Sequence, residues 1–210
     1  KTMDIFIYLF VALFSVLNPI GTVPIFVGLT QGYTASERSQ TSLVTSINVF
    51  IILMISFFVG QYVLSFFGIT ITALRIAGGI IIASSGFSLL NGNFSKNKGI
   101  NKKVQKEVEA RQHIALTPLA MPMLAGPGSI SLLIAYYQEL GEWGSAITSV
   151  EILFSCLAIL AVAVLIYIVL RSAHYLAKIL GSSGIVAISR IIGFLTIAIG
   201  IQYIISATLS

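Results

Sequence analysis

Long hydrophobic runs alternate with short polar stretches along this chain. Six runs are long enough to cross a bilayer, because a transmembrane helix needs about 20 mostly apolar residues. The pattern therefore predicts an all-α polytopic membrane protein with six transmembrane helices. The runs cover residues 5–30, 41–63, 68–90, 114–138, 146–170 and 184–209.

The first run contains residues that suit an uninterrupted helix poorly. They are Asn18, Pro19, Gly21, Thr22 and Pro24. Each proline removes a backbone donor and clashes with the preceding turn, and glycine adds backbone freedom. The sequence thus predicts that the first helix is interrupted within the membrane.

The fourth run carries a second segment of this kind, over residues 118–130. Its residues with the same properties are Pro122, Ala125, Gly126, Pro127, Gly128 and Ser129. Two broken helices at matching positions of two halves are typical of the binding site of a secondary transporter.

Composition supports a membrane protein. The chain has 210 residues, of which 57% are hydrophobic and only 9% are charged, whereas globular chains carry about a quarter charged residues. A large soluble domain is therefore excluded. Cys156 is the single cysteine, so disulfide frameworks and cysteine metal clusters are not expected. No cleavage site for a signal peptide follows the first run.

Basic residues predict the orientation. They concentrate in the segments after the first, third and fifth runs, which places those segments in the cytoplasm and both termini outside. The segment 91–113 is the most basic, and we interpret it as a solvated connector; a patch for anionic lipid or a partner is the alternative. It divides the membrane domain into units 1–90 and 114–210. The basic residues in question are Arg38, Lys96, Lys98, Lys102, Lys103, Lys106, Arg111, Arg171 and Lys178.

The two units resemble each other in sequence. Three matches occur in the same order, and each unit has three runs, so the second unit must enter the membrane from the opposite side. This predicts an inverted-topology repeat. The matches are Pro19-x4-Pro24 with Pro122-x4-Pro127, 45–49 with 148–152, and Arg75–Gly78 with Arg190–Gly193.

The interrupted helices favour a small zwitterionic ligand. Free N–H groups at a helix start attract a carboxylate, and free carbonyls attract an ammonium group. Gly126 and Gly128 would allow a ligand to approach the backbone, while Thr22 and Ser129 would offer hydroxyls and Asn18 an amide. The alternative is that these residues only kink or pack the helices.

Charged residues within the runs are candidates for gating or coupling. Arg75 and Glu151 each lie about six residues into a run from the same side, and we expect them to approach each other. The second sequence match places Asn48 opposite Glu151, which makes Asn48 and Arg190 the corresponding pair on the cytoplasmic side. The alternative is that each arginine extends to its interface or caps a broken helix.

The motifs 18–26 (NPIGTVPIF), 75–79 (RIAGG) and 118–130 (PLAMPMLAGPGSI) resemble the MarC family of prokaryotic integral membrane proteins over the whole chain. The family includes SnatA-type transporters of glycine and other small neutral amino acids. The resemblance implies two inverted three-helix repeats with substrate between the first and fourth helices, and dependence on the proton gradient.

We therefore expect a secondary transporter of small neutral amino acids in a prokaryotic cytoplasmic membrane. Glu151 is the candidate for a proton-linked group. An exporter or channel for another small solute is the alternative. Enzymatic activity, a cofactor, a metal and nucleic-acid binding are not expected, because the runs lack a cluster of nucleophile, acid and base or metal ligands.

Overall fold

The computed structural model describes residues 2–30, 32–91, 124–142 and 148–209. Every regular element within these ranges is an α-helix, which confirms the predicted all-helical class. Five helices in the described part of the chain are long and apolar enough to cross a membrane. They are Met3–Val23, Ala35–Phe67, Ile71–Leu90, Ser149–Gly181 and Val186–Thr208. The fourth predicted run, 114–138, is described only from residue 124 onward.

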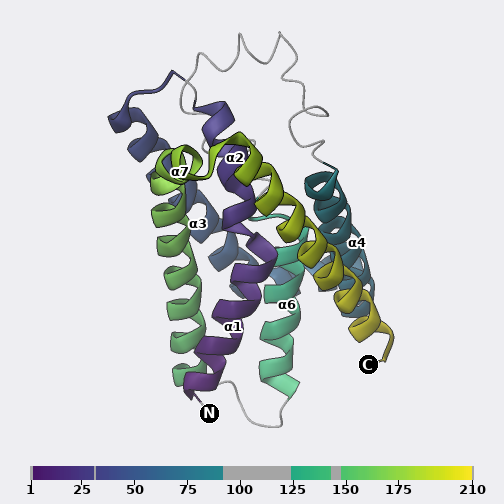
Figure 1. Ribbon diagram of the computed structural model, residues 1–210. Coiled ribbons are helices and arrows are strands. Elements are labelled where there is room, and N and C mark those ends of the chain that lie inside the picture. The colour runs from purple at the N-terminus through teal and green to yellow at the C-terminus, as the bar shows by residue number, and fades with distance from the viewer. Residues whose placement is uncertain (1, 31, 92–123, 143–147, 210) are drawn as a thin grey trace.

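The helices run alternately up and down one long bundle (Figure 1). Helix α1 (Thr2–Leu17) leads from the N-terminus into α2 (Pro19–Leu29), α3 (Ala35–Phe67) returns, and α4 (Ile71–Leu90) runs back again. Helix α6 (Pro127–Glu142) and the two segments of α7 (Ser149–Leu209) then follow the opposite sequence of directions. Both chain ends consequently lie at the same end of the molecule.

Helix α7 consists of two helices that meet at a bend. Gly181 there has φ 63° and ψ 177°, which is not helical. Helix α3 ends in a similar way, because its C-cap Gly68 has φ 65°. Glycine adopts positive φ far more readily than other residues, so these two residues fix where two long helices stop.

Helix α3 and the first segment of α7 also begin alike. In each, a threonine donates from its N–H and its hydroxyl to a glutamate carboxylate three residues later. The N–H bonds are 2.8 Å from Thr34 to Glu37 and 2.9 Å from Thr148 to Glu151. Both helices have 33 residues. Glu37 and Glu151 thus have the same position at the start of a helix, whereas the sequence match set Asn48 opposite Glu151.

The second predicted run begins after the start of its helix, and the fifth predicted run ends before the end of its helix. Residues 35–40 and 171–180 were expected in loops but are helical. The capping interaction of Thr34 with Glu37 starts α3 before the apolar run begins, and no proline or glycine interrupts the first segment of α7 before Gly181. The residues 92–123, including most of the predicted basic connector, lie outside the described part of the chain.

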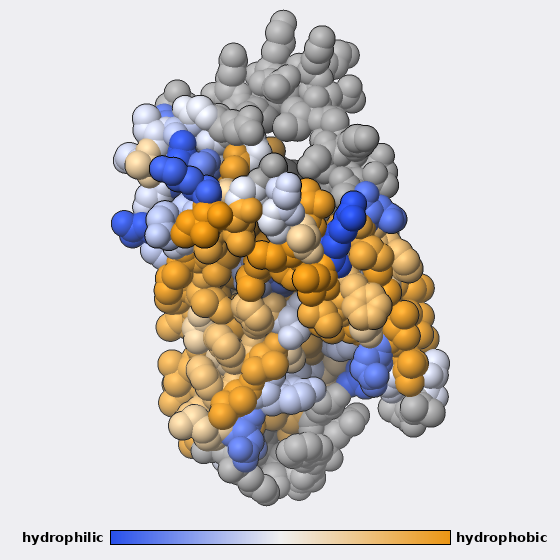
Figure 2. Space-filling view, in the orientation of Figure 1, coloured by the Kyte–Doolittle hydropathy of each residue, from blue (hydrophilic) through white to orange (hydrophobic). Residues whose placement is uncertain are grey.

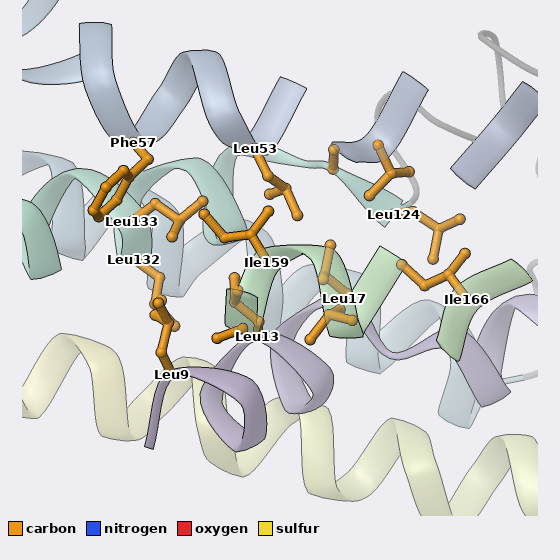
Figure 3. Close-up of a cluster of buried hydrophobic side chains, with 14 of the residues drawn as sticks. Leu9, Leu13, Leu17, Leu53, Phe57, Leu124, Leu132, Leu133, Ile159 and Ile166 are labelled. Atoms are coloured by element: carbon orange, nitrogen blue, oxygen red, sulfur yellow. The ribbon is translucent and has the colours of Figure 1, made fainter. Parts of the chain in front are cut away.

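A hydrophobic core joins α1, α3, α6 and α7. Leu9, Leu13 and Leu17 are at most 1% exposed and recur every four residues, so they form one stripe of α1. Figure 3 shows this stripe facing Leu132 and Ile159. The core contacts of α1 continue to Leu17, the last residue of the helix.

The outer surface is also apolar. Phe66 is 84% exposed and Ile191 62% exposed, and Figure 2 shows a broad hydrophobic belt with hydrophilic residues gathered toward both ends. Lipid is the solvent that suits such a surface, as expected of an integral membrane protein.

Candidate functional site

Asn18 separates α1 from α2. Its backbone is left-handed, with φ 45° and ψ 61°, a conformation that asparagine tolerates better than most residues. Its side-chain Oδ1 accepts from the N–H of Gly21 at 3.1 Å, and its Nδ2 donates to the hydroxyl of Thr196 at 3.2 Å. Asn18 therefore caps α2 and ties that helix start to the last segment of α7.

Pro19 is the first residue of α2, where the absence of an N–H costs nothing. The missing donor also leaves the carbonyl of Ser15 without the N–H expected four residues later. The prediction that Pro24 interrupts the helix is wrong, because α2 continues through it to Leu29. A helix in a membrane can contain one proline when the carbonyl that loses its N–H donor is hydrogen-bonded to another group.

Helix α6 begins in the same manner as α2. Pro127 is its first residue, and Gly126 precedes it in the capping position. The carbonyl of Gly126 accepts from the N–H groups of Ser129 and Ile130, each at 3.1 Å, and from the Ser129 hydroxyl at 2.9 Å. Pro19 and Pro127 are thus both first residues of a helix, while Pro122, which the sequence match paired with Pro19, lies outside the described residues.

These two helix starts line one cavity of about 250 Å³. It lies between α1, α2, α4, α6 and the second segment of α7. The predicted residues that line it are Asn18, Gly21, Thr22, Gly126, Pro127, Gly128 and Ser129. The structure therefore brings together segments that are distant in the sequence.

The remaining predicted residues are placed differently. Pro19 and Ala125 are buried but are not among the residues that line the cavity. Pro24 lies further along α2. Pro122 lies outside the described residues.

Four hydroxyl residues of the cavity were missed from the sequence. Ser84, Ser85 and Ser88 lie on α4, and Thr196 lies on α7. The spacing of Ser84, Ser85 and Ser88 was a usable signal, because it places all three toward one side of a helix. Thr196 carried no such signal in its own run.

Glycine allows the walls of the cavity to approach closely. A Cβ atom at Gly128 would lie 2.6 Å from Cδ1 of Ile82 and 3.4 Å from Cγ1 of Val16. Distances below 3.0 Å are not tolerated without movement, so α6 can meet α1 and α4 here only through glycine.

Glu151 occupies a different position from the one expected. It lies in the first turn of α7, and its carboxylate accepts from Thr148 N–H at 2.9 Å and from the Thr148 hydroxyl at 2.6 Å. It therefore caps a helix end instead of lying six residues inside a helix. Its expected approach to Arg75, and its coupling role, stay predictions.

The other candidate gating residues lie apart from the cavity. Arg75, which is on α4, lines a second cavity. Asn48 is half-buried on α3, and Arg190 is exposed beside a shallow depression that includes Ser183 and Ala187. Among the described residues, no group of three or more histidine, cysteine, aspartate or glutamate side chains could hold a metal ion.

Comparison with known proteins identifies a family likeness over almost the whole chain. Residues 3–210 match the model of the family described as MarC family integral membrane protein. No solved structure matches the chain.

Several bacterial membrane proteins are similar in sequence. The UPF0056 membrane protein of Buchnera aphidicola subsp. Schizaphis graminum is 40% identical over 96% of this chain and 90% of its own length. The UPF0056 membrane protein YhcE of Escherichia coli K12 is 37% identical over 94% and 88%. The UPF0056 inner membrane protein MarC of Escherichia coli ATCC 8739 is 38% identical over 95% and 91%.

Proposed function

This chain belongs to the MarC family of integral membrane proteins, and we propose that it is a secondary transporter of small neutral amino acids. The observation that carries the proposal is the cavity in which the starts of α2 and α6 meet. A helix start carries a partial positive charge, and this charge remains at α2 and α6 although Gly21, Ser129 and Ile130 already donate their N–H groups within the protein. Two such starts at one cavity suit the carboxylate of an amino acid.

The same cavity offers acceptors for an ammonium group. Helix α1 ends at Leu17 beside the cavity, and the last carbonyls of a helix lack helical donors. Val16 and Leu17, the last two residues of α1, both line the cavity. A zwitterion would therefore satisfy both kinds of backbone group at once.

The lining favours a ligand that is small and neutral overall. None of the described residues that line the cavity is charged, and a buried net charge without a partner is costly. A volume of about 250 Å³ is slightly below that of typical ligand sites, which run from about 300 Å³ upward. Small neutral amino acids such as glycine and alanine meet these limits.

We further propose that the fold is an inverted repeat that supports alternating access. The opposite directions of α1, α3 and α4 against α6 and the two segments of α7 support it (Figure 1). So do the matching caps of Glu37 and Glu151. In this proposal, one three-helix unit moves against the other around the cavity.

We place the protein in the bacterial cytoplasmic membrane with both termini outside. One relative is named an inner membrane protein, and the basic segments described above favour this orientation.

Transport of labelled glycine into liposomes tests the proposal. Purified protein should accumulate glycine and alanine when a proton gradient is imposed, and preloaded glycine should drive counterflow. A channel cannot support counterflow, so uptake without counterflow would indicate the alternative. Absence of flux for every small amino acid in both directions would overturn the proposal.

A Glu151→Gln variant tests proton coupling separately. If Glu151 couples protons, gradient-driven accumulation is lost while counterflow persists. Glu37→Gln is the matched control, because Glu37 has the same capping contacts at the start of α3. Equal effects of the two variants would show that Glu151 acts only as a cap.

A further inference from the structure

A second cavity of about 260 Å³ adjoins the first. Val16 lines both cavities. The second cavity lies between α1, α4, α6 and the last segment of α7, and its polar lining includes Tyr8, Ser15, Arg75, Tyr136, Gln202 and Ser206.

The second cavity is nearer to the end of the molecule that carries the termini. Tyr8 lies in the first half of α1, Arg75 in the second turn of α4, and Ser206 in the last turn of α7. Figure 1 shows that these helix ends lie together at the end with the N- and C-termini. A solute that reaches the first cavity from this end would meet the second cavity on its way.

A thin apolar partition separates the two cavities. Val16 and Ile82 both pack toward Gly128, so α1, α4 and α6 meet at this point. Ile82 is buried and Val16 is half-buried. Val16 borders both cavities, so its side chain forms part of the wall between them.

The chemistry of the second cavity differs from that of the first. Arg75 is the charged residue among its described lining residues, and a guanidinium group binds a carboxylate through two parallel hydrogen bonds. Gln202 and Ser206 are exposed on the last segment of α7, where the Gln202 amide donates to the Ser206 hydroxyl at 3.3 Å. Exposed polar side chains are costly to place against lipid. We therefore expect this side of the second cavity to be in contact with water.

The geometry points to the second cavity as a transit site in which Arg75 binds the carboxylate of the amino acid before it enters the first cavity. This inference rests on the proposed function. It assigns Arg75 a role in binding substrate, and the approach of Arg75 to Glu151 expected from the sequence stays a separate prediction.

Thiol chemistry tests the transit site without relying on transport. In a Cys156→Ser background, Ser206→Cys is treated with methanethiosulfonate reagents that carry either a sulfonate or a trimethylammonium group. Arg75 attracts the anionic reagent, so the ratio of sulfonate to trimethylammonium rates should fall about tenfold in Arg75→Gln. Arg75→Lys should keep most of the ratio, and Arg190→Gln, outside this cavity, should leave it unchanged.

Glycine protection is the second measurement. Glycine at a concentration that saturates uptake should slow the modification of the cysteine at position 206 several-fold, and this protection should weaken in Arg75→Gln. An unchanged rate ratio in Arg75→Gln, or the lack of protection by glycine in a protein that transports it, would overturn the transit site. Absence of amino-acid flux in liposomes would instead overturn the proposed function, since the rate ratio is measured without flux.

Discussion

At the scale of single residues, Asn18 performs two tasks. Its left-handed backbone ends α1, and its amide caps α2 through Gly21 while donating to Thr196. A residue with a Cβ but no polar group would lose the cap and keep the backbone strain. Glycine would lose the cap but relieve the strain.

The substitution Asn18→Ala should therefore destabilise the protein more than Asn18→Gly. Loss of the cap costs about 1 kcal/mol, and an alanine held in the left-handed region adds about 1–2 kcal/mol. Thermal unfolding in detergent should give melting temperatures that fall in the order wild type, Asn18→Gly, Asn18→Ala. Equal stability of the two variants would show that the backbone at this position is not held left-handed.

Gly128 provides a second prediction at this scale. Gly128→Ala places a methyl group against Ile82 and Val16, so uptake of glycine in liposomes should fall at least about tenfold, since overpacking displaces the cavity wall. Gly28→Ala is the control, because a Cβ there meets nothing within 4 Å and alanine favours a helix by about 0.5–1 kcal/mol. The double variant Gly128→Ala with Ile82→Ala should recover part of the activity, and no recovery would argue against the contact with Ile82 as the cause.

At the scale of elements, α4 and the last segment of α7 pack backbone to backbone. A Cβ at Gly86 would lie 2.7 Å from the carbonyl oxygen of Gly193, and one at Gly79 would lie 2.7 Å from that of Gly200. Small residues allow this approach, which replaces the hydrophobic effect as the source of helix association in lipid. Gly79 and Gly86 on α4 have the same spacing as Gly193 and Gly200 on α7. Exchanging α4 with the last segment of α7 therefore turns one contact into the other, as the proposed inverted repeat requires. In this correspondence Gly79 is equivalent to Gly193, whereas the sequence match paired Gly78 with Gly193.

A size series at Gly86 tests this packing. Gly86→Ala and Gly86→Leu should lower the melting temperature progressively, since overpacking costs about 1–3 kcal/mol. Ala77→Leu on the exposed side of the same helix should have little effect. The measurement is loss of the monodisperse peak in size-exclusion chromatography after heating. A stable Gly86→Leu variant would contradict the close approach of α4 and α7.

At the scale of the whole molecule, the described helices place both chain ends together. The six predicted crossings would account for this arrangement, and the basic residues favour an outside location for both ends. In this orientation the candidate cavity lies between the two units, and the cavity of Arg75 lies toward the outer face.

Reporter fusions test this topology. Alkaline phosphatase fused after Ser210 should be active in a bacterial host, because it folds outside the cytoplasm, and green fluorescent protein fused at the same position should be dark. Green fluorescent protein inserted in segment 91–113 should fluoresce. The opposite pattern at both positions would reverse the orientation and place Arg75 on the cytoplasmic side.

The sequence by itself determined the helical membrane class and two helix starts of the site. Run length and composition depend only on the thickness of the bilayer and the cost of exposing backbone to lipid. Asn18, Pro19, Gly126 and Pro127 act through local backbone preferences, so they were recognisable without any knowledge of their neighbours.

Only the tertiary structure decided which residues meet. The serines of α4 and Thr196 joined the cavity through the packing of α4 and α7, whose close approach depends on glycines distant in the sequence. Glu151 proved to cap α7, since a threonine three residues earlier donates to its carboxylate. Arg75 gained a cavity of its own because α1, α6 and α7 surround it. Contacts between distant segments depend on how whole helices pack, and no local pattern in the sequence encodes that packing.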